Sequence, residues 1–278
     1  MKASVIISTY NSPEWLEKVL WGYECQSYRN FELVIADDGS GVETRKIIEK
    51  FKAASPEIIH VWHEDRGFQK SEILNKAIQA ATTGSLIFSD GDCIPRKDCV
   101  ATHLKKAKPG HFLSGGYFML PMQTSKCITK NDVLAGKAFS PYWLKENGVP
   151  WTYKSLKLTG IPWLEQFMNF ITPTHATWNG HNSSGWKEDI VSVNGFNEQM
   201  QYGGQDRELG ERLVNKGVMG IQVRYSAICI HLDHKRGYKT EESIRKNNVI
   251  RKQTREQKKT WTDFGIVKSG VRLEEPER

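Results

Sequence analysis

Apolar residues in the first hundred positions fall into short runs that alternate with segments of helical periodicity. Four runs have the length and composition of buried strands: Ala3–Ser8, Phe31–Ala36, Ile58–Trp62 and Ser85–Ser89. Between them, apolar residues recur every three or four positions in three segments: Ser12–Tyr23, Val42–Phe51 and Ser71–Ala81. Strands that alternate with helices favour β-α-β units and a mostly parallel sheet. The pattern therefore predicts an α/β fold for this half of the chain.

Polar residues follow each of the four predicted strands. In a parallel sheet the carboxyl ends of the strands meet at one edge, and ligands bind there. The segments that reach this edge are Thr9-Tyr10-Asn11, Asp37-Asp38-Gly39-Ser40, His63-Glu64-Asp65-Arg66 and Asp90-Gly91-Asp92. Because these segments are rich in carboxylates, we predict that this edge is a binding edge.

The rest of the chain has less regular patterning. Between roughly 108 and 176, glycine, proline and aromatic residues are scattered, which fits either a substrate-shaping insertion or a covering layer. Periodicity returns near Asn182–Phe196 and Asp206–Lys216. From Lys235 to Lys259 ten Lys or Arg residues stand against three Glu, which predicts a solvated, basic helical arm. We divide the chain into 1–107, 108–234 and 235–278, the first two being halves of one domain.

Composition narrows the class of protein. The chain has 278 residues, of which 38% are hydrophobic, and its apolar runs are too short to cross a bilayer. No signal-peptide pattern opens the sequence, so we expect neither a transmembrane nor a classically secreted protein. Five cysteines without C-x-x-C spacing favour reduced thiols and a cytosolic location. The net charge of +7 is compatible with phosphates, nucleic acid or a membrane surface, and does not choose among them.

Two carboxylates, Asp90 and Asp92, lie two residues apart at the end of the fourth predicted strand. Such a pair can hold a hard divalent cation through oxygen ligands and leave positions open for phosphates. An Asp-Gly turn without a ligand is the simpler interpretation. Asp38, in the Asp37–Ser40 turn, could accept hydrogen bonds from a base or ribose, or could only shape the turn.

A second set of polar residues lies in the C-terminal half. Gly203-Gly204-Gln205-Asp206 precedes a helical segment, so Asp206 could act as a general base or only favour the helix N-terminus. His231 follows the apolar run Ala227–Ile230. A histidine at a strand end is more often structural, but an imidazole there could complete a carboxylate metal site if a metal is already present. No P-loop, G-x-S-x-G or H-E-x-x-H motif occurs. The sequence therefore does not indicate a P-loop kinase, a serine hydrolase or a zincin.

In combination, these motifs resemble a family 2 glycosyltransferase of the GT-A fold. The resemblance lies in Val5–Asn11, in Phe31–Ser40 with its Asp-Asp-Gly-Ser turn, in Glu64–Lys70 with Leu74–Ala77, and in the D-x-D of Asp90-Gly91-Asp92. Asn194–Glu198 and Gly203–Asp206 are similar to the C-terminal part of β-1,4-galactosyltransferases and bacterial chondroitin-polymerase-type enzymes. A run of acids follows the glycines in that pattern, whereas here Gln205 precedes Asp206 and Arg207 follows it.

The resemblance implies a Rossmann-like, mostly parallel sheet flanked by helices, and it implies a role for each matching residue. Asp206 would be the catalytic base, Asp92 and His231 the metal ligands, and His234 a less favoured ligand. Asn182, Gly204 and Gln205 would lie on the acceptor or donor-sugar side. The residues implied to bind the nucleotide are Thr9, Tyr10, Asn11, Asp38, Gln69, Lys70, Asn75, Asp90 and Asp92.

The implied reaction is an inverting, metal-dependent transfer of a hexose or N-acetylhexosamine from a UDP-sugar, with Mn²⁺ or Mg²⁺ as cofactor. The acceptor would be a hydroxyl of a glycan or lipid-linked saccharide in the synthesis of cell-surface polysaccharide or lipopolysaccharide. The basic arm would allow peripheral contact with an anionic membrane at its inner face. A nucleotidyltransferase and a basic nucleic-acid-binding protein are the alternatives. The first lacks its usual basic glycine loop after the first strand, and the second lacks a recognised module, so we expect no nucleic-acid partner.

Overall fold

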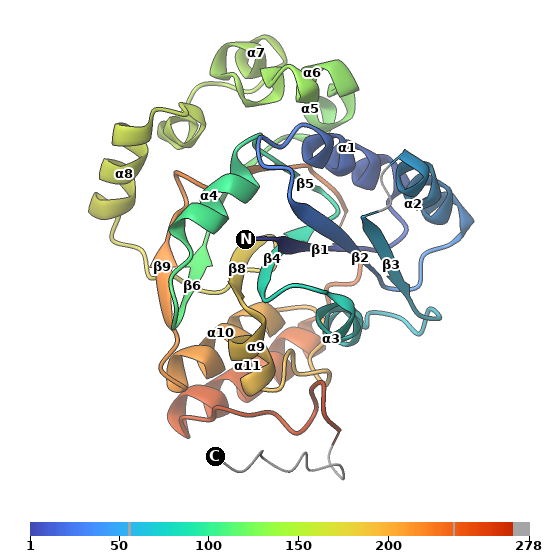
Figure 1. Cartoon of the computed structure of the whole chain (residues 1–278), viewed down its shortest axis with the longest axis vertical. Coiled ribbons are helices and arrows are strands. Elements are labelled where there is room, and N and C mark those ends of the chain that lie inside the picture. The colour runs from blue at the N-terminus through green and yellow to red at the C-terminus, as the bar shows by residue number, and fades with distance from the viewer. Residues whose placement is uncertain (55–56, 236, 269–278) are drawn as a thin grey trace.

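A computed structural model describes residues 1–54, 57–235 and 237–268. Seven strands form the main sheet in the order β3-β2-β1-β4-β8-β6-β9, and three form a small sheet in the order β5-β10-β7 (Figure 1). The strands are β1 (Ala3–Thr9), β2 (Phe31–Asp37), β3 (Ile58–Trp62), β4 (Ser85–Asp90), β5 (Cys93–Pro95), β6 (His111–Ser114), β7 (Gly116–Met119), β8 (Asn182–Trp186), β9 (Met219–Gln222) and β10 (Ile228–His231).

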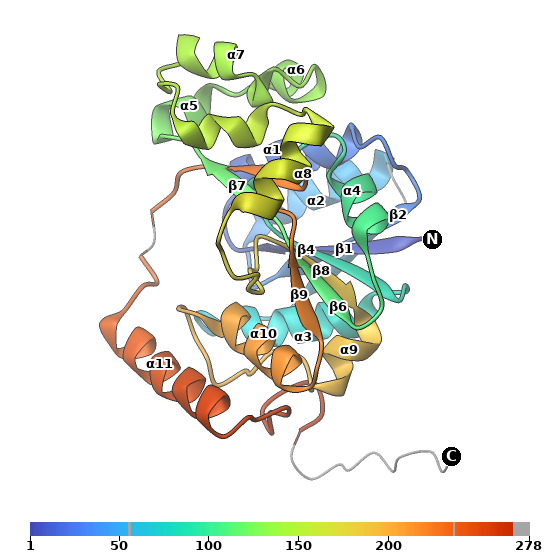
Figure 2. The same ribbon diagram turned by 90° about the vertical axis from the view of Figure 1, so that its left-hand side faces the viewer.

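Helices cover both faces of the main sheet (Figures 1 and 2). The helices that precede β10 in the chain are α1 (Pro13–Glu24), α2 (Val42–Ala54), α3 (Lys70–Ala80), α4 (Cys99–Lys106), α5 (Met122–Cys127), α6 (Lys130–Leu134), α7 (Pro141–Glu146), α8 (Pro162–Ile171), α9 (Lys187–Ser192) and α10 (Gln205–Asn215). The 3₁₀ helix η1 (Lys137–Phe139) lies between α6 and α7, and the 3₁₀ helix η2 (Tyr153–Leu158) lies between α7 and α8. Helix α11 (Glu241–Glu256) follows β10.

The predicted α/β fold is confirmed. β1, β2, β3 and β4 pair in parallel, and β6 pairs in parallel with β9. β8 runs antiparallel to both β4 and β6. The four parallel strands match the four apolar runs closely, and β4 ends at Asp90 itself. Their carboxyl ends therefore meet at one edge, where the polar segments lie.

Apolar residues of β1 are buried on both sides of the sheet, which explains why the strand reads as a continuous apolar run. Val5 and Ile7 pack in one hydrophobic cluster with residues of α1 and β10, whereas Ile6 packs in the other. This second cluster contains Phe88 of β4 and residues of α3 and α10. Side chains alternate between the faces of a strand, so one run of residues supplies both clusters.

The segment between roughly 108 and 176, which has little periodicity, forms β6, β7 and a group of short helices. Helices α5, α6 and α7 gather at one end of the molecule, while α9, α10 and α11 lie at the other (Figures 1 and 2). Val133 of α6, Phe139 of η1 and Leu144 of α7 are buried in the same cluster as α1. Part of the segment is therefore a covering layer over one face of the core.

Helix α11 accounts for much of the predicted basic arm. It packs beside α10 (Figure 2), and its buried residues are Ser243, Asn247 and Thr254. Residue 236 and residues 269–278 of the predicted arm lie outside the described residues. No helix in the described part of the chain is long and apolar enough to cross a membrane.

Candidate active site

A cavity of about 490 Å³ opens at the carboxyl edge of the parallel strands. It is bounded by the ends of β1 and β4, the loop that enters α3, strand β7, and the segment after β10. Polar and aromatic side chains line it, together with one methionine: Ser8, Thr9, Tyr10, Ser12, Trp15, Asp38, Phe68, Lys70, Asp90, Asp92, Tyr117, Met119, His181, Tyr202, Gln205, His231, His234 and Tyr238. Such a site suits a ligand with both an aromatic ring and charged groups.

Asp92, His231 and His234 form a group of metal-ligand type on the cavity wall. Their ligand atoms all lie within 4.8 Å of one another, and Nε2 of His234 is 2.9 Å from Oδ2 of Asp92. Nε2 of His231 lies 4.0 Å from Oδ1 of the same carboxylate. The group is assembled by strand pairing, because His231 of β10 lies opposite Cys93 in the antiparallel register with β5.

The two imidazoles are oriented to present Nε2 to the cavity. Nδ1 of His231 lies 2.8 Å from the carbonyl oxygen of Leu232, and Nδ1 of His234 lies 3.0 Å from that of Lys235. A neutral imidazole that donates from Nδ1 keeps its Nε2 lone pair for a cation. The donor set of one carboxylate and two imidazoles thus fits a divalent metal ion. Nε2 of His231 is outside hydrogen-bond distance of Asp92, whereas Nε2 of His234 donates to that carboxylate and would have to give up this proton to bind a cation.

The charge on Asp92 is favoured by its neighbours. Burial opposes ionisation of this carboxyl group, but the hydrogen bond to His234 and the nearby imidazoles hold its pKa well below its usual range. Sγ of Cys93 adds a contact to Oδ1 at 3.3 Å. Asp92 is therefore available as an anionic ligand at neutral pH.

Asp90 is held by Lys70 rather than by the imidazoles. Oδ1 of Asp90 accepts hydrogen bonds from Nζ of Lys70 at 2.6 Å and from Oγ of Ser8 at 2.7 Å. Burial opposes ionisation of Asp90, yet the ammonium group of Lys70 lowers its pKa. Burial likewise opposes the charge of that ammonium group, but the carboxylates of Asp90, Asp206 and Asp92 hold its pKa above the usual value.

Asp206 is the second residue of α10 and lies close to Lys70. Its Oδ2 accepts a hydrogen bond from the backbone N–H of Gly180 at 2.9 Å, and its Oδ1 accepts one from that of Arg207 at 2.8 Å. Asp206 and Lys70 both lie next to Gly180, because a methyl group added at Gly180 would be 3.6 Å from Oδ2 of Asp206 and 3.7 Å from Nζ of Lys70. The neighbouring Gln205 lines the cavity. The carboxylate of Asp206 is thus held beside the cavity and half-buried.

The two glycines before α10 have left-handed backbones, with φ of +116° at Gly203 and +86° at Gly204. A side chain would be strained there, and it would also meet helix α11: Ile244 at 3.2 Å from Gly203, and Arg251 at 3.0 Å from Gly204. The close approach at these glycines is therefore to α11. Nδ2 of Asn247 donates to the carbonyls of residues 201, 202 and 203, so α11 supports the loop that carries Asp206.

Asp38, directly after β2, also lines the cavity. Its Oδ1 lies 2.8 Å from Nε2 of His63, and its Oδ2 accepts the backbone N–H of Gln69 at 3.0 Å. Burial raises the pKa of Asp38 even though these hydrogen bonds oppose the shift. The exposed ring of Tyr10 lines the same region, and its hydroxyl donates to Asp65 at 2.9 Å. A hydrogen-bonding carboxylate beside an exposed aromatic ring can bind a heterocyclic base.

Residues 4–119 match glycosyl transferase family 2, and residues 172–235 match a family described as the N-terminal domain of galactosyltransferase. The two ranges together cover more than half of the chain, and they contain every lining residue of the cavity named above except Tyr238. Residues 4–119 form a family 2 glycosyltransferase domain. The C-terminal half of the chain carries a galactosyltransferase-like segment.

Similar proteins include other glycosyltransferases. The uncharacterized glycosyltransferase YfnE of Bacillus subtilis is 26% identical over 279 residues, which cover 89% of this chain and 69% of YfnE. Chondroitin synthase of Escherichia coli is 25% identical over 226 residues, covering 77% of this chain but 32% of that enzyme. The chain therefore spans only a part of the longer relatives.

Solved structures of low sequence identity share the fold of this glycosyltransferase. Mannosyltransferase PcManGT from Pyrobaculum calidifontis, in complex with GDP-Man and Mn²⁺, superposes with a TM-score of 0.57 at 20% identity, over 85% of this chain and 58% of that one. GalNAc-T7 with UDP, GalNAc and Mn²⁺ gives a TM-score of 0.62 at 15% identity, over 90% and 47% of the respective chains. The GT-A architecture is thus common to all three.

Eight of the predicted site residues of this glycosyltransferase line the cavity: Thr9, Tyr10, Asp38, Lys70, Asp90, Asp92, Gln205 and His231. Five others are not lining residues and make contacts within the protein instead. Asn75 exchanges hydrogen bonds with the backbone of Phe196, and Oδ1 of Asn11 accepts the N–H of Gly41. Nδ2 of Asn182 donates to the carbonyls of residues 116 and 227. Gln69 contacts Asp38 through its backbone, and Gly204 packs on α11.

Sequence reasoning missed His181 in this glycosyltransferase. Its ring lies 4.8 Å from that of Tyr117 and 6.4 Å from that of His231, within the cavity wall. Nε2 of His181 is buried and has no hydrogen-bond partner among the described residues, and burial lowers its pKa to about 4. The residue precedes β8 in a segment without periodicity, so no sequence signal marked it. Phe68, Tyr202 and Tyr238, whose rings pack together at the cavity, were also missed. Phe68 lies in the Glu64–Lys70 segment that carries the resemblance, but no role was assigned to it.

Proposed function

We propose that the protein transfers a hexose or N-acetylhexosamine from a UDP-sugar to a hydroxyl group of a saccharide acceptor, free or lipid-linked, with inversion at the anomeric carbon. The observation that carries the proposal is the placement of Asp206 and the Asp92–His231–His234 group near one ammonium group, that of Lys70. Asp206 is not itself a lining residue, but it adjoins the lining residue Gln205. A base beside a cavity that carries a cation site is what an inverting displacement of a nucleoside diphosphate requires. We further propose that the enzyme acts in the cytoplasm, in the synthesis of a surface polysaccharide.

Asp92, His231 and His234 would hold the metal ion, which we propose to be Mn²⁺ or Mg²⁺. When bound, the ion would neutralise charge that develops on the diphosphate as it leaves. Imidazole nitrogen in the donor set favours Mn²⁺, because Mg²⁺ prefers oxygen ligands and water. The two solved neighbours that contain Mn²⁺ have the same fold, which supports testing this ion first.

The residues of the chain have distinct tasks in this proposal. Tyr10 and Asp38 would bind the base, and Asp90, fixed by Ser8 and Lys70, would accept hydrogen bonds from the ribose. The acceptor oxygen would form the new bond to the anomeric carbon while the bond from that carbon to the diphosphate oxygen breaks. The hydroxyl proton would pass to the carboxylate of Asp206, and UDP would leave with the bonding electrons.

His181 is suited to contact the donor sugar. A neutral imidazole donates one hydrogen bond and accepts one, and the buried Nε2 of His181 has neither among the described residues. A sugar hydroxyl in the cavity could pair with it at no cost to an existing contact. We propose that His181 helps to select the donor sugar.

The experiment is a donor screen on the purified chain. A panel of UDP-hexoses and UDP-N-acetylhexosamines, with GDP-mannose for comparison, is incubated with Mn²⁺, and slow release of the nucleoside diphosphate by hydrolysis is measured. We expect release from a UDP-sugar that stops when EDTA is added. Release of pyrophosphate from UTP and a sugar phosphate would instead support a nucleotidyltransferase. No release from any donor, together with salt-sensitive binding of arbitrary nucleic acid, would contradict the proposal.

A further inference from the structure

Helix α8 (Pro162–Ile171) presents apolar side chains to solvent. Trp163 is 70% exposed, Phe167 53% and Phe170 89%. Positions four and seven residues apart fall on one face of a helix, so the three rings form a single outward stripe. Large exposed apolar patches are uncommon on proteins without a partner there and mark interaction sites.

The opposite face of α8 is polar and holds the helix to the domain. Glu165, itself buried, forms an ion pair with Arg96 at 2.8 Å. Nδ2 of Asn169 donates to Oγ of Ser226 at 2.9 Å, and Oδ1 of Asn169 accepts the backbone N–H of Tyr225 at 3.0 Å. Turning the aromatic stripe inward would break a buried ion pair, which costs several kcal/mol. The outward orientation is therefore fixed by the fold.

Cationic side chains lie beside this helix. Arg224 adjoins Tyr225 in the loop that anchors α8, and its Nη1 lies 3.4 Å from Oγ1 of Thr174. The charges of Arg224 and Lys154 add to burial in lowering the pKa of Lys157, so the three cations are close neighbours. Within the described ranges, none of the three forms an ion pair with a carboxylate. No carboxylate in that part of the chain neutralises their charge, and the exposed Lys154 and half-buried Arg224 are the cations best placed to meet an anionic partner outside the chain.

We propose that the aromatic stripe of α8, with Lys154, Lys157 and Arg224, is a docking surface for an anionic lipid bilayer. Trp and Phe rings inserted at the headgroup level, with Lys and Arg at their edge, are typical of helices that lie in a membrane interface. Each cation near an anionic surface contributes about 1 kcal/mol. A second copy of the chain fits less well, because a two-fold contact through this patch would bring the three cations against their own copies.

The docking surface is adjacent to the active-site cavity. Nζ of Lys157 donates to the carbonyl of Tyr117 at 3.3 Å and lies 5.7 Å from the centre of its ring, and Tyr117 lines the cavity. A bilayer that docks at α8 would thus hold an acceptor with a lipid anchor near the site. The docking itself depends on α8 and the cations, and not on the donor or on the proposed chemistry.

Vesicle co-sedimentation tests the proposal. The full chain is mixed with vesicles of phosphatidylcholine alone, or of phosphatidylcholine with phosphatidylglycerol. We expect binding to the anionic vesicles, and a loss of more than about tenfold in affinity for the triple variant Trp163→Ser, Phe167→Ser, Phe170→Ser. Lys154→Gln with Arg224→Gln should weaken binding and reduce its salt dependence. The matched control is Trp261→Ser with Phe264→Ser, two rings of 45% and 44% exposure outside α8.

Three results would overturn the proposal: wild-type protein that ignores anionic vesicles, a triple variant that binds like wild type, or a wild-type dimer that the triple variant turns into a monomer. Thermal melts check that the variants are folded. We expect them to fold, because the replaced rings are exposed and not part of the core. UDP release by hydrolysis, measured without vesicles, should be unchanged in the triple variant. A failure of docking is thereby separated from a failure of the proposed transferase activity.

Discussion

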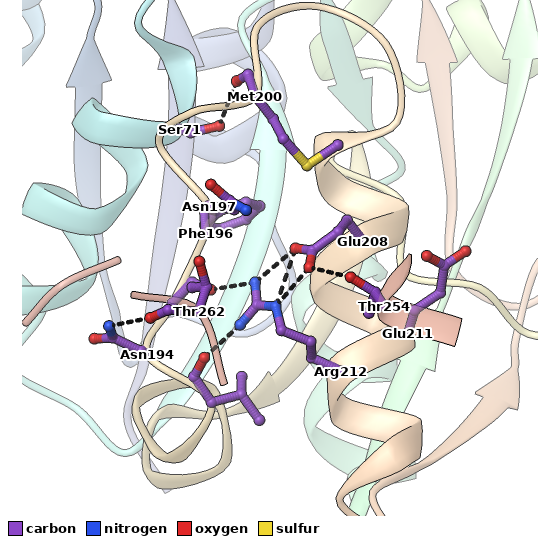
Figure 3. Close-up of polar contacts among 12 residues, drawn as sticks. Ser71, Asn194, Phe196, Asn197, Met200, Glu208, Glu211, Arg212, Thr254 and Thr262 are labelled. Atoms are coloured by element: carbon purple, nitrogen blue, oxygen red, sulfur yellow. Dashed lines mark hydrogen bonds and ion pairs between the residues drawn. The ribbon is translucent and has the colours of Figure 1, made fainter. Parts of the chain in front are cut away.

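Arg212 and Glu208, one turn apart on α10, form an ion pair in which both side chains are buried (Figure 3). Nε of Arg212 lies 2.9 Å from Oε1 of Glu208, and Nη2 lies 2.8 Å from Oε2. The same guanidinium donates to the backbone carbonyls of Val193 and Gly195, on either side of Asn194 with its left-handed φ of 67°. The pair therefore joins the helix that carries Asp206 to the turn before it.

We predict that Glu208→Gln lowers the free energy of unfolding by about 3 kcal/mol, because the guanidinium of Arg212 would stay buried without its counter-charge. Oγ1 of Thr254 on α11 also donates to Glu208, so α11 should loosen from α10 in the variant. Urea unfolding followed by circular dichroism measures the change. Glu43→Gln, in an exposed pair with Lys46, is the control and should shift stability by less than about 1 kcal/mol. Equal effects of the two substitutions would show that burial does not govern the strength of this pair.

The parallel half of the fold could be predicted from the sequence because its strands are buried on both faces. Val5, Ile6 and Ile7 alternate between two hydrophobic clusters, and this leaves an uninterrupted apolar run that is easily recognised. The order of strands then fixes the edge at which Asp38, Asp90 and Asp92 emerge. These features depend on local pattern and on the general rule for parallel sheets.

The remaining features depend on contacts between distant parts of the chain. His234 comes close to Asp92 only because β10 pairs with β5, and no local pattern encodes that register. Asn75 and Asn182 have the polarity of ligand-binding residues, yet each satisfies backbone groups far away in sequence. A buried amide that shapes a loop and one that binds a ligand look alike in a sequence, and only the fold distinguishes them.

Asp206→Asn tests the proposed base. An amide cannot take the proton of the acceptor hydroxyl, so transfer should fall by about 10²- to 10⁴-fold while the affinity for UDP stays within about twofold. Transfer is followed by UDP release with acceptor, and binding by calorimetry with UDP and Mn²⁺. Glu188→Gln, an acidic residue in the first turn of α9, serves as the matched control. Parallel loss of binding and transfer would contradict the assignment of Asp206 as base.

His231→Ala and His234→Ala test whether both imidazoles bind the metal ion. Because their Nε2 atoms share the carboxylate of Asp92, we expect each variant to need at least about tenfold more Mn²⁺ for half-maximal UDP release. The Mn²⁺ affinity of each protein in the presence of UDP is measured by electron paramagnetic resonance. The exposed His175→Ala is the control. If His234→Ala retains wild-type Mn²⁺ affinity, His234 is not a ligand and only orients Asp92.

Acid pH should destabilise the fold through His103. Nδ2 of Asn182 donates to two carbonyls, so its Oδ1 must accept from Nε2 of His103, and Nδ1 then accepts from the hydroxyl of Ser184. Burial lowers the pKa of this neutral imidazole from 6.5 to about 4. The unfolded chain therefore binds a proton that the folded chain does not, and stability falls as pH decreases from about 6.5 to about 4.

The loss from this one group amounts to about 3 kcal/mol over that range, given 1.36 kcal/mol per pKa unit. His103→Gln, which cannot be protonated, should be less stable than wild type at pH 8 but should lose about 3 kcal/mol less between pH 7 and pH 4. Urea titrations at several pH values measure both slopes, and the exposed His175→Gln should keep the wild-type slope. Identical slopes for His103→Gln and wild type would mean that His103 is not the buried group whose protonation opposes folding.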